Sequence, residues 1–192
     1  MDWRRTWLVG MYGSTNPSRA RRAAMRWIVI STLIAAYGAS TEFVPAALTA
    51  DIGDYLSGAV TLLVSGFVWH GYWTGRIPWG VRPRSWVARL LSMAFVPMFI
   101  FGVSWLVVVR AIPDLATRTF GTEASKAMHA EASYRSRRRS CDHQLRSDAI
   151  PFPGYICISP SEFSRLAPGG EVNIIGKTTI LGIHVEKVES AR

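Results

Sequence analysis

The chain has 192 residues, with 22 Lys and Arg against 13 Asp and Glu, and its formal net charge is +9. Hydrophobic residues make up 49% of it and charged residues only 18%, whereas soluble domains average about 25% charged residues. This composition excludes a long disordered chain, which would be polar and highly charged. Two cysteines are too few for a multi-disulfide scaffold or a four-cysteine zinc site.

Three long stretches of the first half carry almost no charge. Between Trp27 and Ala50 the only charged residue is Glu42, and residues 55–75 and 90–109 contain none. An apolar helix of about 20 residues crosses the ~30 Å hydrocarbon core of a bilayer. Buried helices of a soluble protein are also apolar all round, but under 200 residues leave too little chain to cover three of them. We therefore predict an α-helical membrane domain over 27–110, with transmembrane helices at about 27–48, 55–75 and 88–109, after a basic segment at 1–26.

Glu42 and His70 are the side chains within these predicted helices that are candidates for a functional role. Glu42 is either an intramembrane carboxylate on a proton or ion path or an interfacial residue near the helix end. Asp51 and Asp54 follow soon after and indicate a solvent-exposed segment, which favours the interfacial interpretation. His70, among aromatic residues at the end of the second helix, is either a titrating switch or an interfacial histidine, and the second interpretation is again favoured.

The distribution of arginine predicts the orientation. Six arginines and one acid precede the first predicted helix, four arginines lie between 76 and 89, and residues 49–54 hold two acids and no base. By the positive-inside rule the N-terminal segment and the 76–89 loop are cytoplasmic, and the 49–54 loop lies outside. Three crossings then place residues 111–192 outside, so we expect a multi-pass protein of the bacterial inner membrane with a periplasmic C-terminus. A cleaved signal peptide fits poorly, because the basic segment and the apolar stretch are both too long.

The C-terminal part shows a β-pattern in short runs. β-Branched and aromatic residues, turn signals and alternation predict a small all-β or α+β domain, curled and barrel-like, in residues 111–192. A helical turn is expected after the cap Ser159 with Pro160 at its first position, and Gly176-Lys177 is expected to separate the last two strands. The predicted strands are 127–133, 140–145, 154–159, 171–175 and 180–188.

The two cysteines belong to neighbouring predicted strands. Cys141 and Cys157 are expected to form a disulfide in an oxidising compartment, closing a loop of about 16 residues and contributing roughly 3 kcal/mol. The alternatives are two free thiols or a metal site that includes His143. A metal needs three or four ligands, and no partner motif accompanies these residues, so the disulfide is favoured.

A basic run precedes the first cysteine. Arg135, Arg137, Arg138 and Arg139 are either a solvated loop or a contact surface for anionic lipid headgroups, an acidic glycan or an acidic protein. Such runs often bind nucleic acid, but outside the membrane that partner is not expected.

No sequence motif indicates catalysis. The chain lacks G-x-S-x-G, H-E-x-x-H and a P-loop, and neither cofactor nor metal is expected. The leading hypothesis is a non-enzymatic membrane anchor that displays the β-domain as a binding or accessory module, with the lipid bilayer and an envelope protein or anionic lipid surface as partners. An immunity protein against a toxin that acts on the membrane or periplasm is the alternative. An enzyme or transporter subunit needs paired polar residues within the helices, where only Glu42 and His70 qualify.

Overall fold

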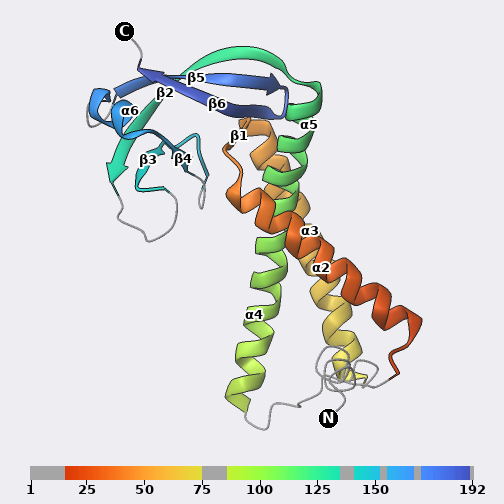
Figure 1. The fold of residues 1–192 in the computed structure, drawn as a ribbon. Helices are drawn as coiled ribbons and strands as arrows, with labels where there is room; N and C mark the ends of the chain where they lie inside the picture. The colour runs from red at the N-terminus through yellow and green to blue at the C-terminus, as the bar shows by residue number, and fades with distance from the viewer. Residues whose placement is uncertain (1–15, 75–85, 135–140, 152–154, 167–169, 191–192) are drawn as a thin grey trace, which may run out of the picture.

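The structure, a computed structural model, describes residues 16–74, 86–134, 141–151, 155–166 and 170–190. Long helices extend from one side of a curled antiparallel sheet (Figure 1). The helices are α2 (Arg19–Ser40), α3 (Ala47–Trp73), α4 (Trp86–Trp105), the π-helix η1 (Leu106–Ala111), α5 (Ile112–Phe120) and the short α6 (Pro160–Arg165). The strands are β1 (Phe43–Pro45), β2 (Thr122–Tyr134), β3 (His143–Arg146), β4 (Ile156–Cys157), β5 (Gly170–Thr179) and β6 (Gly182–Ser190).

Three helical segments of the described chain are long and apolar enough to cross a membrane, judged by length and composition. This confirms the predicted number of apolar helices, but their bounds differ from the predicted ones. The first helix ends at Ser40, where Thr41 turns extended, instead of at about 48. The third continues from α4 through η1 and α5 to Phe120, instead of ending at about 109. The candidate spans are Arg21–Ser40, Ala47–Gly71 and Met93–Phe120.

The long helices bury small side chains and expose large apolar ones. Four buried residues of α3 recur at every fourth position, and all of them are small: Gly53, Ser57, Thr61 and Ser65. On its outer surface Leu62 is 77% exposed and Phe67 73%. Small residues let helix backbones approach closely, and the outer apolar surface has the chemistry of a lipid contact. This arrangement is the one expected of membrane helices rather than of a water-soluble bundle.

The sheet has six antiparallel strands in the order β1-β6-β5-β2-β3-β4 and curls into a half-barrel. Five of the strands and the helical turn α6 were predicted, in the observed order. The sixth, β1, lies between α2 and α3 in a segment that the sequence assigned to the first transmembrane helix. Its residue Val44 pairs with Ile183 of β6. The connection between two helices of the anchor therefore forms an edge strand of the domain.

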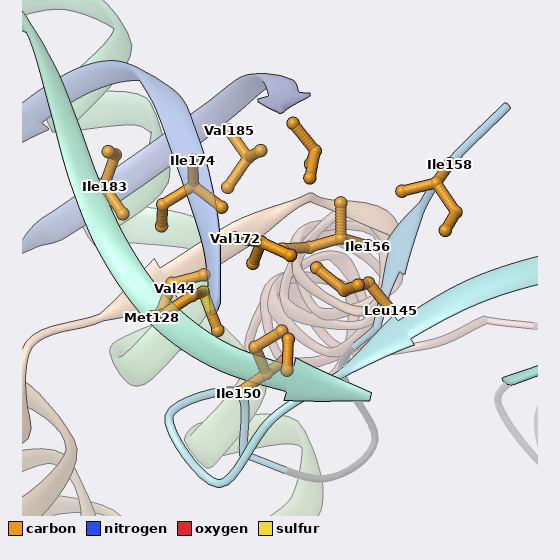
Figure 2. Packing of buried hydrophobic residues seen from close by; sticks show 12 residues of the cluster. Val44, Met128, Leu145, Ile150, Ile156, Ile158, Val172, Ile174, Ile183 and Val185 are labelled. Carbon is orange, nitrogen blue, oxygen red and sulfur yellow. The ribbon is translucent and has the colours of Figure 1, made fainter. Parts of the chain in front are cut away.

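The core of the half-barrel is aliphatic. Figure 2 shows Val44 of β1 among side chains from the other strands, including Leu145, Ile156 and Ile174. These three side chains are at most 1% exposed. The segment between α2 and α3 thus contributes a residue to the core of the sheet domain, and the two regions share one hydrophobic cluster.

The turn between β5 and β6 lies further along the chain than predicted. Gly176 does not end a strand but sits inside β5 beside an irregularity in its pairing with β6. A Cβ at this position would overlap the backbone carbonyl of His184, so the glycine permits the close approach of the two strands. The turn itself is formed by Ile180 and Leu181.

At α6 the predicted cap is confirmed, because Ser159 and Glu162 form a reciprocal capping box.

Candidate functional site

The sequence-predicted polar residues of the helices lie in different places. Glu42 lies between α2 and β1, and its carbonyl oxygen accepts a hydrogen bond from the backbone N–H of Val185 at 2.9 Å. Its carboxylate Oε1 accepts another from the backbone N–H of Cys157 at 3.1 Å. Glu42 therefore connects the end of α2 to both β6 and β4. His70 is exposed in the last turn of α3 and is not part of this junction.

The two cysteines form the predicted disulfide. Cys141 and Cys157 are bonded, with their Cα atoms 5.7 Å apart. Cys141 is buried, whereas Cys157 is exposed in the edge strand β4. The bridge therefore holds β4 beside the start of β3. Arg135, Arg137, Arg138 and Arg139 lie outside the described residues.

A buried carboxylate stands where the helices meet the sheet. Asp114 of α5 is fully buried, and its Oδ2 accepts hydrogen bonds from the Tyr37 hydroxyl at 2.5 Å and from Arg118 Nε at 3.0 Å. His184 Nδ1 lies 2.8 Å from Asp114 Oδ1. The last two atoms are not aligned for a directed hydrogen bond, so we treat this contact as electrostatic, an ion pair when the imidazole is protonated. One carboxylate thus joins α2, α5 and β6.

A buried arginine adds a second connection. Arg110 of η1 is 1% exposed, and its Nη2 donates a hydrogen bond to the carbonyl oxygen of Thr41, just before β1. Its Nε and Nη1 have no hydrogen-bond partner among the described residues. An unsatisfied buried guanidinium is costly unless a negative charge lies near, and Asp114, one helical turn further on, supplies that charge. We call Tyr37, Arg110, Asp114, Arg118 and His184 the junction cluster.

Helix geometry explains why these residues meet. Arg110, Asp114 and Arg118 are four residues apart, so η1 and α5 present them on one face. The π-helical turn widens the backbone at this place, a feature frequent at functional sites. Gly38 of α2 allows η1 to approach, because a Cβ there would come within 2.5 Å of the Leu106 carbonyl oxygen. The close contact brings Tyr37 next to Asp114.

The turn between β5 and β6 packs against the same helix. The hydroxyls of Thr117 and Thr179 are 2.8 Å apart. Lys177 Nζ donates a hydrogen bond to the carbonyl oxygen of Arg118 at 3.0 Å. These contacts hold the β5–β6 turn against α5. The half-barrel is therefore attached to the helices through this turn as well as through its edge strands β1 and β4.

The chemistry of the junction cluster is that of a structural connection. Its carboxylate is enclosed by donors from its own chain, and no group of three or more His, Cys, Asp or Glu among the described residues is placed to hold a metal ion. A substrate cannot reach Asp114 in this arrangement, since its side chain has no exposed surface. What the cluster does is fix the orientation of the sheet relative to the helices.

Sequence reasoning missed this cluster, although a signal for it was present. The spacing Arg110-x3-Asp114-x3-Arg118 is typical of charged residues along one helix face. The prediction instead ended the third helix at the first of these charges. Tyr37 and His184 come from distant segments, and nothing in their local sequence predicts the contact.

No protein-family model, curated protein or solved structure matches this chain.

Proposed function

We propose that the protein is a non-enzymatic binding or accessory module of the bacterial inner membrane. Its three helices anchor it with the N-terminus in the cytoplasm, and its disulfide-stapled half-barrel faces the periplasm. The arginine distribution supports this orientation, and the disulfide fits an oxidising compartment.

The observation that carries the proposal is the attachment of the sheet to the anchor. A domain on a flexible linker would sample many orientations, because few contacts would cross the linker. Here β1 belongs to the segment between α2 and α3 and pairs with β6, Asp114 of α5 contacts His184 of β6, and Glu42 accepts a hydrogen bond from the backbone of Cys157 in β4. A fixed platform of this kind presents one constant surface above a membrane, which suits a module that positions a partner.

Fusions test the proposed location. Alkaline phosphatase attached after Arg192 is expected to be active, because it folds only after export, and green fluorescent protein at the same place is expected to be dark. Bright fluorescence and inactive phosphatase would overturn the orientation and the proposed compartment together.

Photo-crosslinking in the native cell tests the binding role. A photoreactive residue at Lys126, Glu171 or Glu186, all exposed on the sheet, is expected to give a discrete adduct from at least one position. The adduct should disappear in the Asp114→Asn background, where the sheet loses its attachment, and persist with Asp51→Asn, a change at an exposed acid of α3. Absence of adducts from all three positions would contradict a binding module.

A further inference from the structure

The turn between β5 and β6 carries an unusually exposed apolar side chain. Ile180 is 91% exposed, the largest value among the large apolar residues that the structure describes. Most of the large aliphatic residues of the sheet, among them Ile174, Ile183 and Val185, are enclosed in the half-barrel. Single exposed apolar residues are common on protein surfaces. The exposure of Ile180 therefore indicates a functional role only if its position in the fold gives it a partner.

That position is directly above the start of a candidate membrane span. The backbone N–H of Ala46 donates a hydrogen bond to the carbonyl oxygen of Leu181 at 2.8 Å, and the candidate span of α3 begins at Ala47. On its other side the turn is held to α5 through the contact of Thr179 with Thr117. Two neighbours of Ile180, one on either side, are therefore fixed to helices that enter the proposed bilayer.

The third helix continues the lipid-facing surface up to this level. Exposed apolar side chains lie in α4 at Trp86, Val87, Leu90, Leu91, Phe95, Met98, Phe99 and Phe101, and in α5 at Ile112, Leu115 and Phe120. The candidate span Met93–Phe120 has 28 residues, which at 1.5 Å per residue is a length of about 42 Å. A bilayer with its headgroups is about 40–45 Å thick. The outer end of this surface, at Phe120, therefore reaches the outer headgroup layer, and α5 lies beside the turn (Figure 1).

Basic groups accompany the apolar ones at this place. Arg118 keeps 44% of its side chain exposed while it binds Asp114, and Lys177 lies next to it. Apolar side chains together with Lys or Arg are typical of segments that lie at a membrane surface, because lipid phosphates are negatively charged.

We propose that the β5–β6 turn, with Ile180 at its tip, contacts the outer headgroup layer of the bilayer that holds the helices. Phe120, the last residue of α5, contacts the same layer. The occupant of this surface is the phospholipid bilayer itself, because the surface continues the lipid-facing side of the third helix. This inference rests on the proposed membrane anchor and extends it. The half-barrel then lies on the membrane instead of standing clear of it, and its far side alone faces a partner.

Fluorescence quenching in vesicles tests the contact. The full-length chain, with its native disulfide oxidised, receives one added cysteine labelled with a nitrobenzoxadiazole fluorophore. It is reconstituted into vesicles of phosphatidylcholine and phosphatidylglycerol that carry a nitroxide either on the headgroup or within the acyl chain. We expect the headgroup nitroxide to quench Ile180→Cys and Phe120→Cys several-fold more than Glu171→Cys, an exposed position at the opposite end of β5.

A helix position separates the two proposals. Leu62→Cys, on the outer surface of α3, should be quenched by the acyl-chain nitroxide if the helices span the bilayer. Strong quenching there with equally weak quenching at positions 180, 120 and 171 would overturn the surface contact alone and leave the apolar turn to a protein partner. Loss of quenching at position 62 would overturn the membrane anchor and the contact that rests on it. The unaltered chain, which should take no label, controls for the disulfide.

Discussion

The helices and the sheet bury opposite kinds of side chain. In α3 the inner face is made of small residues such as Ser57 and Ser65, and large apolar residues such as Leu62 point outward. In the sheet, Leu145 and Ile174 are completely buried. The hydrophobic effect explains the second pattern in water, but it provides no force between helices in lipid, where close packing takes over. The sheet is therefore packed as a domain that folds in water, and the helices are packed as expected of segments that are long and apolar enough to cross a membrane.

The difference has a consequence at the place where the two regions meet. The junction is packed neither like the helices nor like the sheet. It contains buried charged side chains, Asp114 and Arg110. Asp114 is enclosed by Tyr37, Arg118 and His184 from three elements. The hydrogen bonds of Asp114 with Tyr37 and Arg118 are directional, unlike apolar contacts, and hold α5 against α2, while the contact of Asp114 with His184 links this pair of helices to β6.

The largest effect is expected from removing the charge at the junction. Asp114→Asn leaves the buried guanidinium of Arg110 without the negative charge of Asp114, and an uncompensated buried charge costs about 3–5 kcal/mol. The change also removes the ion pair with the half-exposed Arg118, which contributes little. We expect the variant to insert its helices but to lose the attachment of the sheet, seen as rapid proteolysis of the C-terminal part. Asp51→Asn is the matched control and should behave as the unaltered chain. Equal protease resistance of both variants would show that the cluster does not hold the regions together.

The same truncation should give different results in the two regions. Leu145→Ala opens a cavity in the sheet core and should cost about 2–5 kcal/mol. Leu62→Ala removes a side chain that faces lipid and should change the stability of the reconstituted protein much less, because lipid fills the space. Thermal unfolding of both variants in vesicles measures the difference. Similar losses would mean that α3 is covered by protein and not by lipid.

Much of this organisation follows from the sequence, for physical reasons. Charge-free stretches of sufficient length predict the three apolar helices, since each must satisfy its backbone internally. The strands of the sheet domain carry local patterns, and so five of them and the cap at Ser159 were predicted. The disulfide between Cys141 and Cys157 follows from the small size of the domain and the predicted compartment.

The parts that were missed depend on distant contacts. Three residues from Phe43 to Pro45 are too short for a pattern, and they form a strand because β6 offers an edge at that place. The predicted third helix ended too early because a charged residue, Arg110, was taken to mark the membrane boundary. The sequence alone does not show that Asp114 lies close enough to compensate its charge. The turn at Ile180 was misplaced because Gly176, usually a strand breaker, is accommodated at an irregularity of the sheet.

The disulfide is expected to stabilise the sheet and to leave the stability of the helices unchanged. Replacing Cys141 and Cys157 by Ser removes a bridge across a sequence separation of 16 residues. The chain-entropy model gives a loss of about 3 kcal/mol for such a loop. We expect a lower unfolding temperature of the sheet and unchanged protease protection of the helices. A matching loss of protection in the helices would show that the two regions unfold as one cooperative unit.

The smallest effect is expected at Glu42, whose carboxylate reaches from the anchor to the exposed edge strand β4. Glu42→Ala removes the acceptor of the Cys157 backbone N–H, and because water can replace it at this exposed site the cost should be about 1 kcal/mol. Glu42→Gln keeps an acceptor oxygen of similar reach and should lose less. Hydrogen exchange at the Cys157 amide is the direct measurement, with faster exchange in Glu42→Ala than in Glu42→Gln. Equal exchange in both variants and in the unaltered chain would show that this contact does not hold β4, and that the sheet is attached to the helices through the junction cluster, β1 and the β5–β6 turn.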